Sequence, residues 1–240
     1  MKPLLRLFGC CVAACLAASC SSSAHMVVRD NADYSVTAEF IPSALLEKNI
    51  TRLLKQKGNQ DAEQSVFNSA ELKASLTEAG ITVKDITLKG AMGLSAACTL
   101  PYNHELLKDL IRYDRIGKTV LLRISPENIS AFLEAVPQES RDFIDLFMAP
   151  LFTGDKMPLA EYEELIGAAY GKRVAAELRK AEFVLTVDVP YRIQTARIHP
   201  IGAITVPVKT DTNSRASVRI PLLELLCTVG TIEAQLTGNS

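Results

Sequence analysis

The chain has 240 residues, a formal net charge of −1 and 22% charged residues, with acidic and basic side chains interspersed. It contains no tryptophan and no basic run, so it lacks the electrostatic signature of nucleic-acid-binding proteins. The length allows one large domain or two small ones, and the 48% of hydrophobic residues are enough to build a buried core.

The first 19 residues have the pattern of a bacterial signal peptide. Lys2 and Arg6 give a short basic start, and Leu7 to Ala18 form an apolar stretch too short for a permanent membrane span. Small residues then lead into Cys20. This order predicts export, cleavage before Cys20, and attachment of a diacylglycerol and an N-acyl chain to that cysteine, with no other cofactor.

The spacing before Cys20 departs from the common lipobox, in which a leucine lies three residues before the cysteine. Leu16 lies four residues before it, which is similar to the relaxed lipobox of spirochaete lipoproteins. Cys15 is a competing acceptor, but cleavage there would cut the apolar region short. We therefore predict lipidation at Cys20, with plain secretion as the alternative, followed by a serine-rich tether over residues 20–31. No aspartate follows Cys20, which favours the outer membrane, with the domain facing the periplasm or the cell surface.

The first half of the mature chain mixes strand and helix patterns. Apolar residues recur every second position in the expected strands and at helical spacing in the expected helices. In chain order we expect a strand over 32–41, helices over 43–55 and 70–78, strands over 81–88 and 93–100, a helix over 103–112 and a strand over 118–124. Gly80 is expected to end the second helix, and Gly90 to bend the chain between the two strands.

The second half divides into a helical part and a strand-rich part. Residues 126–181 are mostly helical in pattern, with a break at Gly171, and residues 182–240 form the β-rich end. The expected strands there cover 183–189, 192–198, 203–208, 217–220 and 232–236. The whole pattern predicts a single α+β domain over residues 32–240. It would consist of an antiparallel sheet with helices packed on one face and a helical insertion over 126–181.

Two cysteines follow Cys20, namely Cys98 and Cys227. Both have apolar neighbours in the sequence, as small buried hydrophobic residues do. An oxidising envelope would also permit a disulfide between them. The sequence leaves free thiols and a bridge open, and neither state predicts catalysis.

The usual catalytic signatures are missing from the mature sequence. It contains no metalloprotease helix, nucleophile elbow, phosphate-binding glycine loop or closely spaced cysteine pair. His25, in the expected tether, and the scattered His104 and His199 are interpreted as ordinary surface or hydrogen-bonded residues. The acidic residues from Asp155 to Glu164 lack the spacing of a calcium loop and indicate a solvated helix face. We therefore expect no catalytic residue and no metal site.

The most apolar stretch after the signal runs from Phe143 to Phe152. One interpretation is a buried helix that ends at Pro150. The other is a surface that lines an apolar ligand groove or touches the membrane. In that case the contacting residues would be Phe143, Phe147, Met148, Leu151 and Phe152.

Two resemblances add to this pattern. The signal, Cys20 and the following serines resemble spirochaete lipoproteins, as does the stretch Phe147–Gly154 followed by a helix with Tyr162. The early strand, the amphipathic helices and the strand pair from Ile81 to Leu100 are similar to the LppM-like lipoprotein domain. That second resemblance implies an α+β envelope domain that binds lipid or glycolipid, and it implies no catalytic residue.

The sequence therefore favours a non-enzymatic envelope lipoprotein that is anchored to the membrane through Cys20 and binds lipid or another apolar ligand. The alternative is a structural or assembly lipoprotein that acts through contacts with envelope proteins. An envelope hydrolase is the last hypothesis, because no nucleophile–base set is visible.

Overall fold

The structure is a computed structural model. It describes residues 20–30, 33–56, 67–90, 93–104, 107–125, 157–199, 208–227 and 230–238. These residues form an α+β structure, which confirms the expected fold class at this level. Its strands are β1 (Cys20–Val28), β2 (Tyr34–Pro42), β3 (Thr82–Lys89), β4 (Gly93–Leu100), β5 (Ile111–Asp114), β6 (Thr119–Ile124), β7 (Glu182–Asp188), β8 (Ile193–His199), β9 (Val208–Thr212), β10 (Arg215–Pro221) and β11 (Ile232–Gly238). Its helices are α2 (Ala44–Gln56), α3 (Ser69–Glu78), α7 (Leu159–Tyr170), α8 (Lys172–Leu178) and α9 (Leu222–Leu226).

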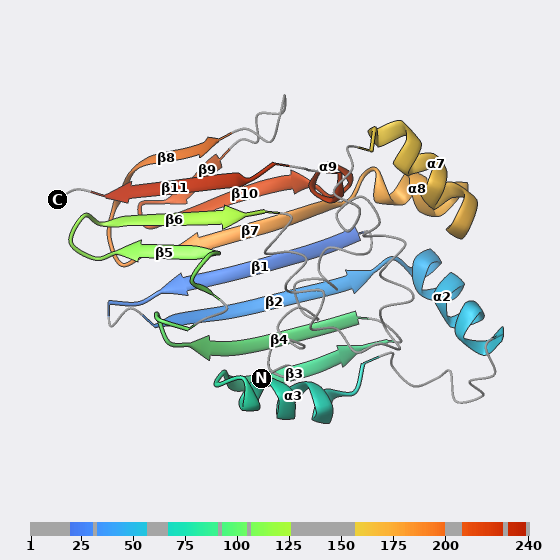
Figure 1. The fold of residues 1–240 in the computed structure, drawn as a ribbon, viewed down its shortest axis with the longest axis horizontal. Helices are drawn as coiled ribbons and strands as arrows, with labels where there is room; N and C mark the ends of the chain where they lie inside the picture. The colour runs from blue at the N-terminus through green and yellow to red at the C-terminus, as the bar shows by residue number, and fades with distance from the viewer. Residues whose placement is uncertain are drawn as a thin grey trace.

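The strands form two sheets. The larger sheet has seven strands in the order β3-β4-β2-β1-β7-β10-β9, and the smaller has four in the order β5-β6-β11-β8. Figure 1 shows the smaller sheet lying over the β1, β7 and β10 part of the larger one. Buried apolar residues of both sheets belong to one core, which includes Phe40, Leu185, Ile220, Val120 and Leu236. Helix α3 lies against β3 and adds Leu72 and Leu76 to this core.

Strand β1 stands at the centre of the larger sheet, between β2 and β7 (Figure 1). Cys20 to Val28 pair with β2 in antiparallel register, so that Cys20 lies opposite Pro42. Ser22 to Val27 also pair with β7, in parallel register. From Ser22 onward, β1 is therefore hydrogen-bonded on both sides.

The expected flexible tether over residues 20–31 is wrong for residues 20–28. Serines are frequent in turns and linkers, and three of them in a row suggested a tether. The segment nevertheless has the alternating burial of a strand, with the side chains of Ser22, Met26 and Val28 buried. Two neighbouring strands supply the hydrogen bonds that a tether would have made with water.

The single antiparallel sheet expected from the sequence is also corrected. The first and last parts of the chain do share a sheet, but they meet through the parallel pair β1–β7. Strands β5 and β6 instead join β11 and β8 in the smaller sheet. Alternation in a sequence shows which face of a strand is buried, but it does not show which strand lies next to it.

Most individual elements are confirmed, with one exception among the described residues. The helix expected over 103–112 is wrong, because residues 107–110 form a turn and Ile111 begins β5, where it is buried opposite Leu122. Of the strand expected over 203–208, only Val208 lies within the described residues, where it begins β9 (Val208–Thr212). The helix end at Gly80 is confirmed by a φ of +80°, a conformation that favours glycine.

Helices α2, α7 and α8 gather at the end of the larger sheet where β1 begins (Figure 1). Ser43 caps α2, since the backbone N–H of Leu46 donates to its Oγ at 3.1 Å. The Ser43 hydroxyl donates to Glu177 of α8 at 2.5 Å, and the Asn49 side chain donates to the carbonyl of Tyr170 in α7 at 3.2 Å. These bonds tie α2 to the α7–α8 pair.

The break expected at Gly171 is confirmed, because this residue separates α7 from α8 with a φ of +100°. The helical pattern expected over 126–181 is therefore observed at its C-terminal end, in α7 and α8. Residues 126–156 of that range lie outside the described residues.

Candidate functional site

Cys20, the expected lipidation site, is the first residue of β1. The residue that the signal pattern predicts as the new N-terminus thus belongs to the central strand. If the chain is cleaved there, no linker separates Cys20 from the sheet. Since β1 runs from Cys20 to the buried Met26 and Val28, an anchor on Cys20 would be joined directly to the core.

The expected apolar contact residues all lie outside the described residues. They are Phe143, Phe147, Met148, Leu151 and Phe152. The buried-helix and ligand-groove interpretations of this stretch therefore both stay predictions.

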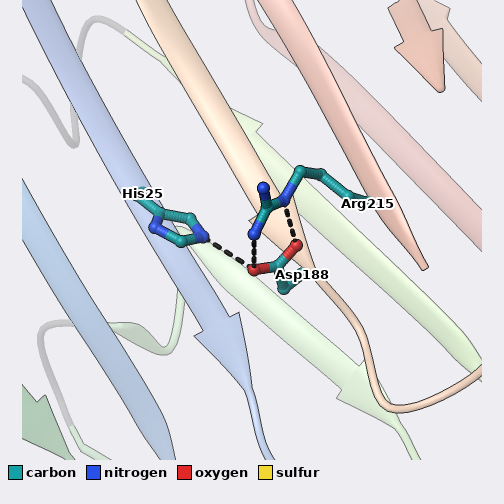
Figure 2. Close-up of polar contacts among 3 residues, drawn as sticks. All are labelled: His25, Asp188 and Arg215. Carbon is teal, nitrogen blue, oxygen red and sulfur yellow. Dashed lines mark hydrogen bonds and ion pairs between the residues drawn. The ribbon is translucent and has the colours of Figure 1, made fainter. Parts of the chain in front are cut away.

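A charged cluster that the sequence did not reveal joins three strands of the larger sheet (Figure 2). Arg215 of β10 donates to Asp188 of β7 through Nε, 2.6 Å from Oδ1, and through Nη2, 2.8 Å from Oδ2. The Nε2 atom of His25 in β1 lies 2.8 Å from Asp188 Oδ2. The Asp188 side chain is 21% exposed, whereas those of His25 and Arg215 are about 40% exposed. The aspartate is thus the most enclosed member of the cluster.

Strand register brings the three side chains together. Arg215 lies directly opposite Asp188 across the β10–β7 pair, and His25 lies opposite Thr186, two residues from Asp188, across the β1–β7 pair. Figure 2 shows the three side chains on the side of the larger sheet away from β5 and β6. We call this side the outer face.

The charges in the cluster stabilise the ionised aspartate. The hydrogen bonds from Arg215 lower the pKa of the Asp188 carboxyl below its usual value; burial opposes this effect, and the bond to His25 adds to it. A carboxyl whose pKa is lowered by folding stabilises the fold above its unfolded-state pKa. That contribution is lost as the pH falls through the lowered, folded-state pKa.

The cluster has the form of a cross-strand ion pair. In a catalytic His–Asp pair, the second ring nitrogen of the histidine faces a nucleophile. Among the described residues, the ring of His25 has no hydrogen-bond partner other than Asp188. Both carboxylate oxygens of Asp188 already accept hydrogen bonds from Arg215. This geometry favours a role in joining β1, β7 and β10.

The other two histidines lie apart from this cluster. The Nε2 atom of His104 lies 2.8 Å from the carbonyl oxygen of Ala79, just after α3. His199 ends β8, opposite Glu233 of β11. The structure thus does not bring the three histidines of the mature sequence into one site. His25 lies in a central strand and not in a tether.

Cys98 and Cys227 are free thiols. Cys98 is buried in β4, and its sulfur lies 3.7 Å from the carbonyl oxygen of Val36. Burial raises the pKa of the Cys98 thiol to about 12 and that of Cys227 to about 11. Such thiols are largely protonated at neutral pH and react slowly.

Two kinds of feature are absent from the residues that the structure describes. These residues contain no group of three or more His, Cys, Asp or Glu residues arranged to hold a metal ion. They also contain no helix with the length and apolar character needed to cross a bilayer.

Sequence reasoning missed the cluster because it had placed His25 in a linker. The alternation from Ser22 to Val28 was a signal that could have identified a strand. Asp188 and Arg215 both lie near strand ends, where charged residues are common. Comparisons with family models, curated proteins and solved structures gave no match.

Proposed function

We propose that this protein is a non-enzymatic lipoprotein of the bacterial cell envelope, anchored through acyl chains on Cys20. The observation that carries the proposal is the place of Cys20 in the fold. The signal pattern ends at Ser19, and Cys20 itself belongs to the central strand β1. Cleavage at this point would keep the whole of β1 in the mature protein.

The anchor would be strong enough to hold the protein at the membrane. Each buried CH₂ group contributes about 0.8 kcal/mol, and two or more acyl chains give stable attachment. We place the protein in the outer membrane, because no aspartate follows Cys20.

The domain is proposed to bind lipid or another apolar ligand, with Phe143, Phe147, Met148, Leu151 and Phe152 as contact residues. Residues 126–181 are proposed to form a helical insertion, with the helices of the domain on one face of the larger sheet. The alternative is an assembly role through contacts with an envelope protein.

Replacing Cys20 with Ala is expected to abolish acylation, because the thiol that carries the diacylglycerol is gone. The measurement is incorporation of labelled palmitate in cells, together with separation of membrane and soluble fractions. Cys15→Ala is the matched control, and we expect it to keep both the label and the membrane location. Label that survives in Cys20→Ala but is lost in Cys15→Ala would move the anchor to Cys15. Label that is absent from the unmodified protein would favour plain secretion.

The protein that starts at Ser21 is expected to copurify with lipid in a defined stoichiometry, because a ligand site would retain its occupant during purification. Native mass spectrometry of residues 21–240, followed by lipid extraction, measures this. A protein mass without bound lipid would contradict the ligand proposal and favour the protein-contact alternative.

A further inference from the structure

We infer that the end of the larger sheet at which β1 begins is a membrane-contact surface, held against the lipid headgroups by the anchor on Cys20. The inference rests on the proposed lipidation of Cys20. We call this end of the sheet, with Cys20, Ile41, Pro42 and the first turns of α2, the anchor end.

Cys20 is part of the sheet and is not joined to it by a linker. Cys20 lies opposite Pro42, and neighbouring strands in a sheet lie about 5 Å apart. From Ser22 onward β1 is paired on both sides, so this part of the chain cannot extend away from the domain. Acyl chains on Cys20 would place that residue at the bilayer surface. The anchor end must then lie there as well.

The anchor end exposes an apolar side chain and basic side chains. Ile41, opposite Ser21, is 37% exposed, although it is a large apolar residue. Helix α2 begins two residues after Pro42 and exposes Lys48 and Arg52. An exposed isoleucine and exposed basic side chains at one end of the sheet suit the boundary between acyl chains and anionic headgroups.

Strand β1 runs from the anchor end to the opposite end of the larger sheet. A strand rises about 3.3 Å per residue, so Val28 lies about 26 Å from Cys20 along the strand. Figure 1 shows the turn between β5 and β6 at this far end of the larger sheet. Ile116 in that turn is 93% exposed. It offers a control position that carries the same residue type as Ile41.

The test compares the labelling of a cysteine at each end of the sheet. Ile41→Cys and Ile116→Cys are introduced separately into the full chain with Cys227→Ala, and Cys98 stays because it is buried. The purified lipidated proteins are bound to preformed vesicles of phosphatidylethanolamine and phosphatidylglycerol. A bulky maleimide is then added, with and without detergent. We expect the cysteine at position 41 to react about tenfold more slowly on vesicles than in detergent, and the one at 116 to react equally in both.

A second variant tests whether the anchor sets the orientation. Ten Gly/Ser residues inserted between Cys20 and Ser21 give a linker with a typical reach of about 17 Å. We expect this linker to restore fast labelling at position 41 while the protein stays on the vesicles.

Equal labelling at position 41 on vesicles and in detergent, with the protein still vesicle-bound and acylated, would overturn the inference but leave the proposed lipidation intact. Protection that survives the ten-residue linker would also overturn it. Loss of acylation and of vesicle binding would overturn the proposed function and this inference together.

Discussion

Deleting residues 20–28 is expected to abolish folding of the domain. Strand β1 pairs with β2 on one side and β7 on the other, so its loss would separate β3-β4-β2 from β7-β10-β9. Buried Met26 and Val28 contribute about 1.5–3 kcal/mol each, and each hydrogen bond of the two ladders about 0.5–1.5 kcal/mol. Together these approach the 5–15 kcal/mol that typically stabilises a whole domain. Circular dichroism and thermal unfolding of residues 29–240 measure the effect.

The matched control is the protein that starts at Ser21 and lacks only Cys20 and the residues before it. It keeps the register of β1 from Ser22 onward and is expected to unfold cooperatively. Cooperative unfolding of both proteins at similar temperatures would show that β1 is not part of the folded domain. The tether interpretation of residues 20–31 would then return.

Replacing Phe40 with Ala is expected to lower the free energy of unfolding by about 3–5 kcal/mol, because the change leaves a cavity in the core. Phe40 is 1% exposed and lies between Ser22 of β1 and Leu94 of β4 in the strand register. Urea denaturation followed by circular dichroism measures the difference. A loss of this size would confirm that the inner face of β2 packs in the core.

The control is Ile41→Ala, one residue further along the same strand. Successive side chains of a strand point to opposite faces, and Ile41 is 37% exposed. We expect this change to cost less than about 1 kcal/mol, since little buried apolar area is lost. Equal losses at the two positions would contradict the assignment of the faces of β2. Of the two positions, only Ile41 belongs to the anchor end. Comparing Phe40→Ala with Ile41→Ala therefore separates an effect on stability from an effect on membrane contact.

Because β1 belongs to the larger sheet, the residue at which a shortened version of the protein starts decides whether it keeps the central strand. A soluble version of the protein that starts near residue 32, where the sequence places the domain boundary, would lack the central strand. Cys20, the proposed anchor residue, and the core residue Met26 lie on one continuous strand. The orientation of the sheet at a membrane would thus be set by β1 and not by a flexible linker.

Of the candidate site residues, the sequence predicts Cys20 but not the charged cluster. The prediction of lipidation at Cys20 rests on a local pattern, because a signal peptidase would recognise the residues just before the cysteine. The cluster of His25, Asp188 and Arg215 depends on residues more than 160 positions apart, and no local pattern relates them. Only the registers of β1, β7 and β10 bring them within hydrogen-bond distance.

Local patterns predict the α+β class and most strands and helices, because alternation and helical spacing reflect local burial. The same local reasoning favours Cys20 over Cys15 as the predicted lipidation site. Local patterns do not show that residues 20–28 are the central strand or that the strands divide between two sheets; both depend on the folded arrangement. The reason is that β-pairing is non-local. A serine-rich segment becomes a strand when two partners supply its hydrogen bonds, and those partners, β2 and β7, are brought together by the fold.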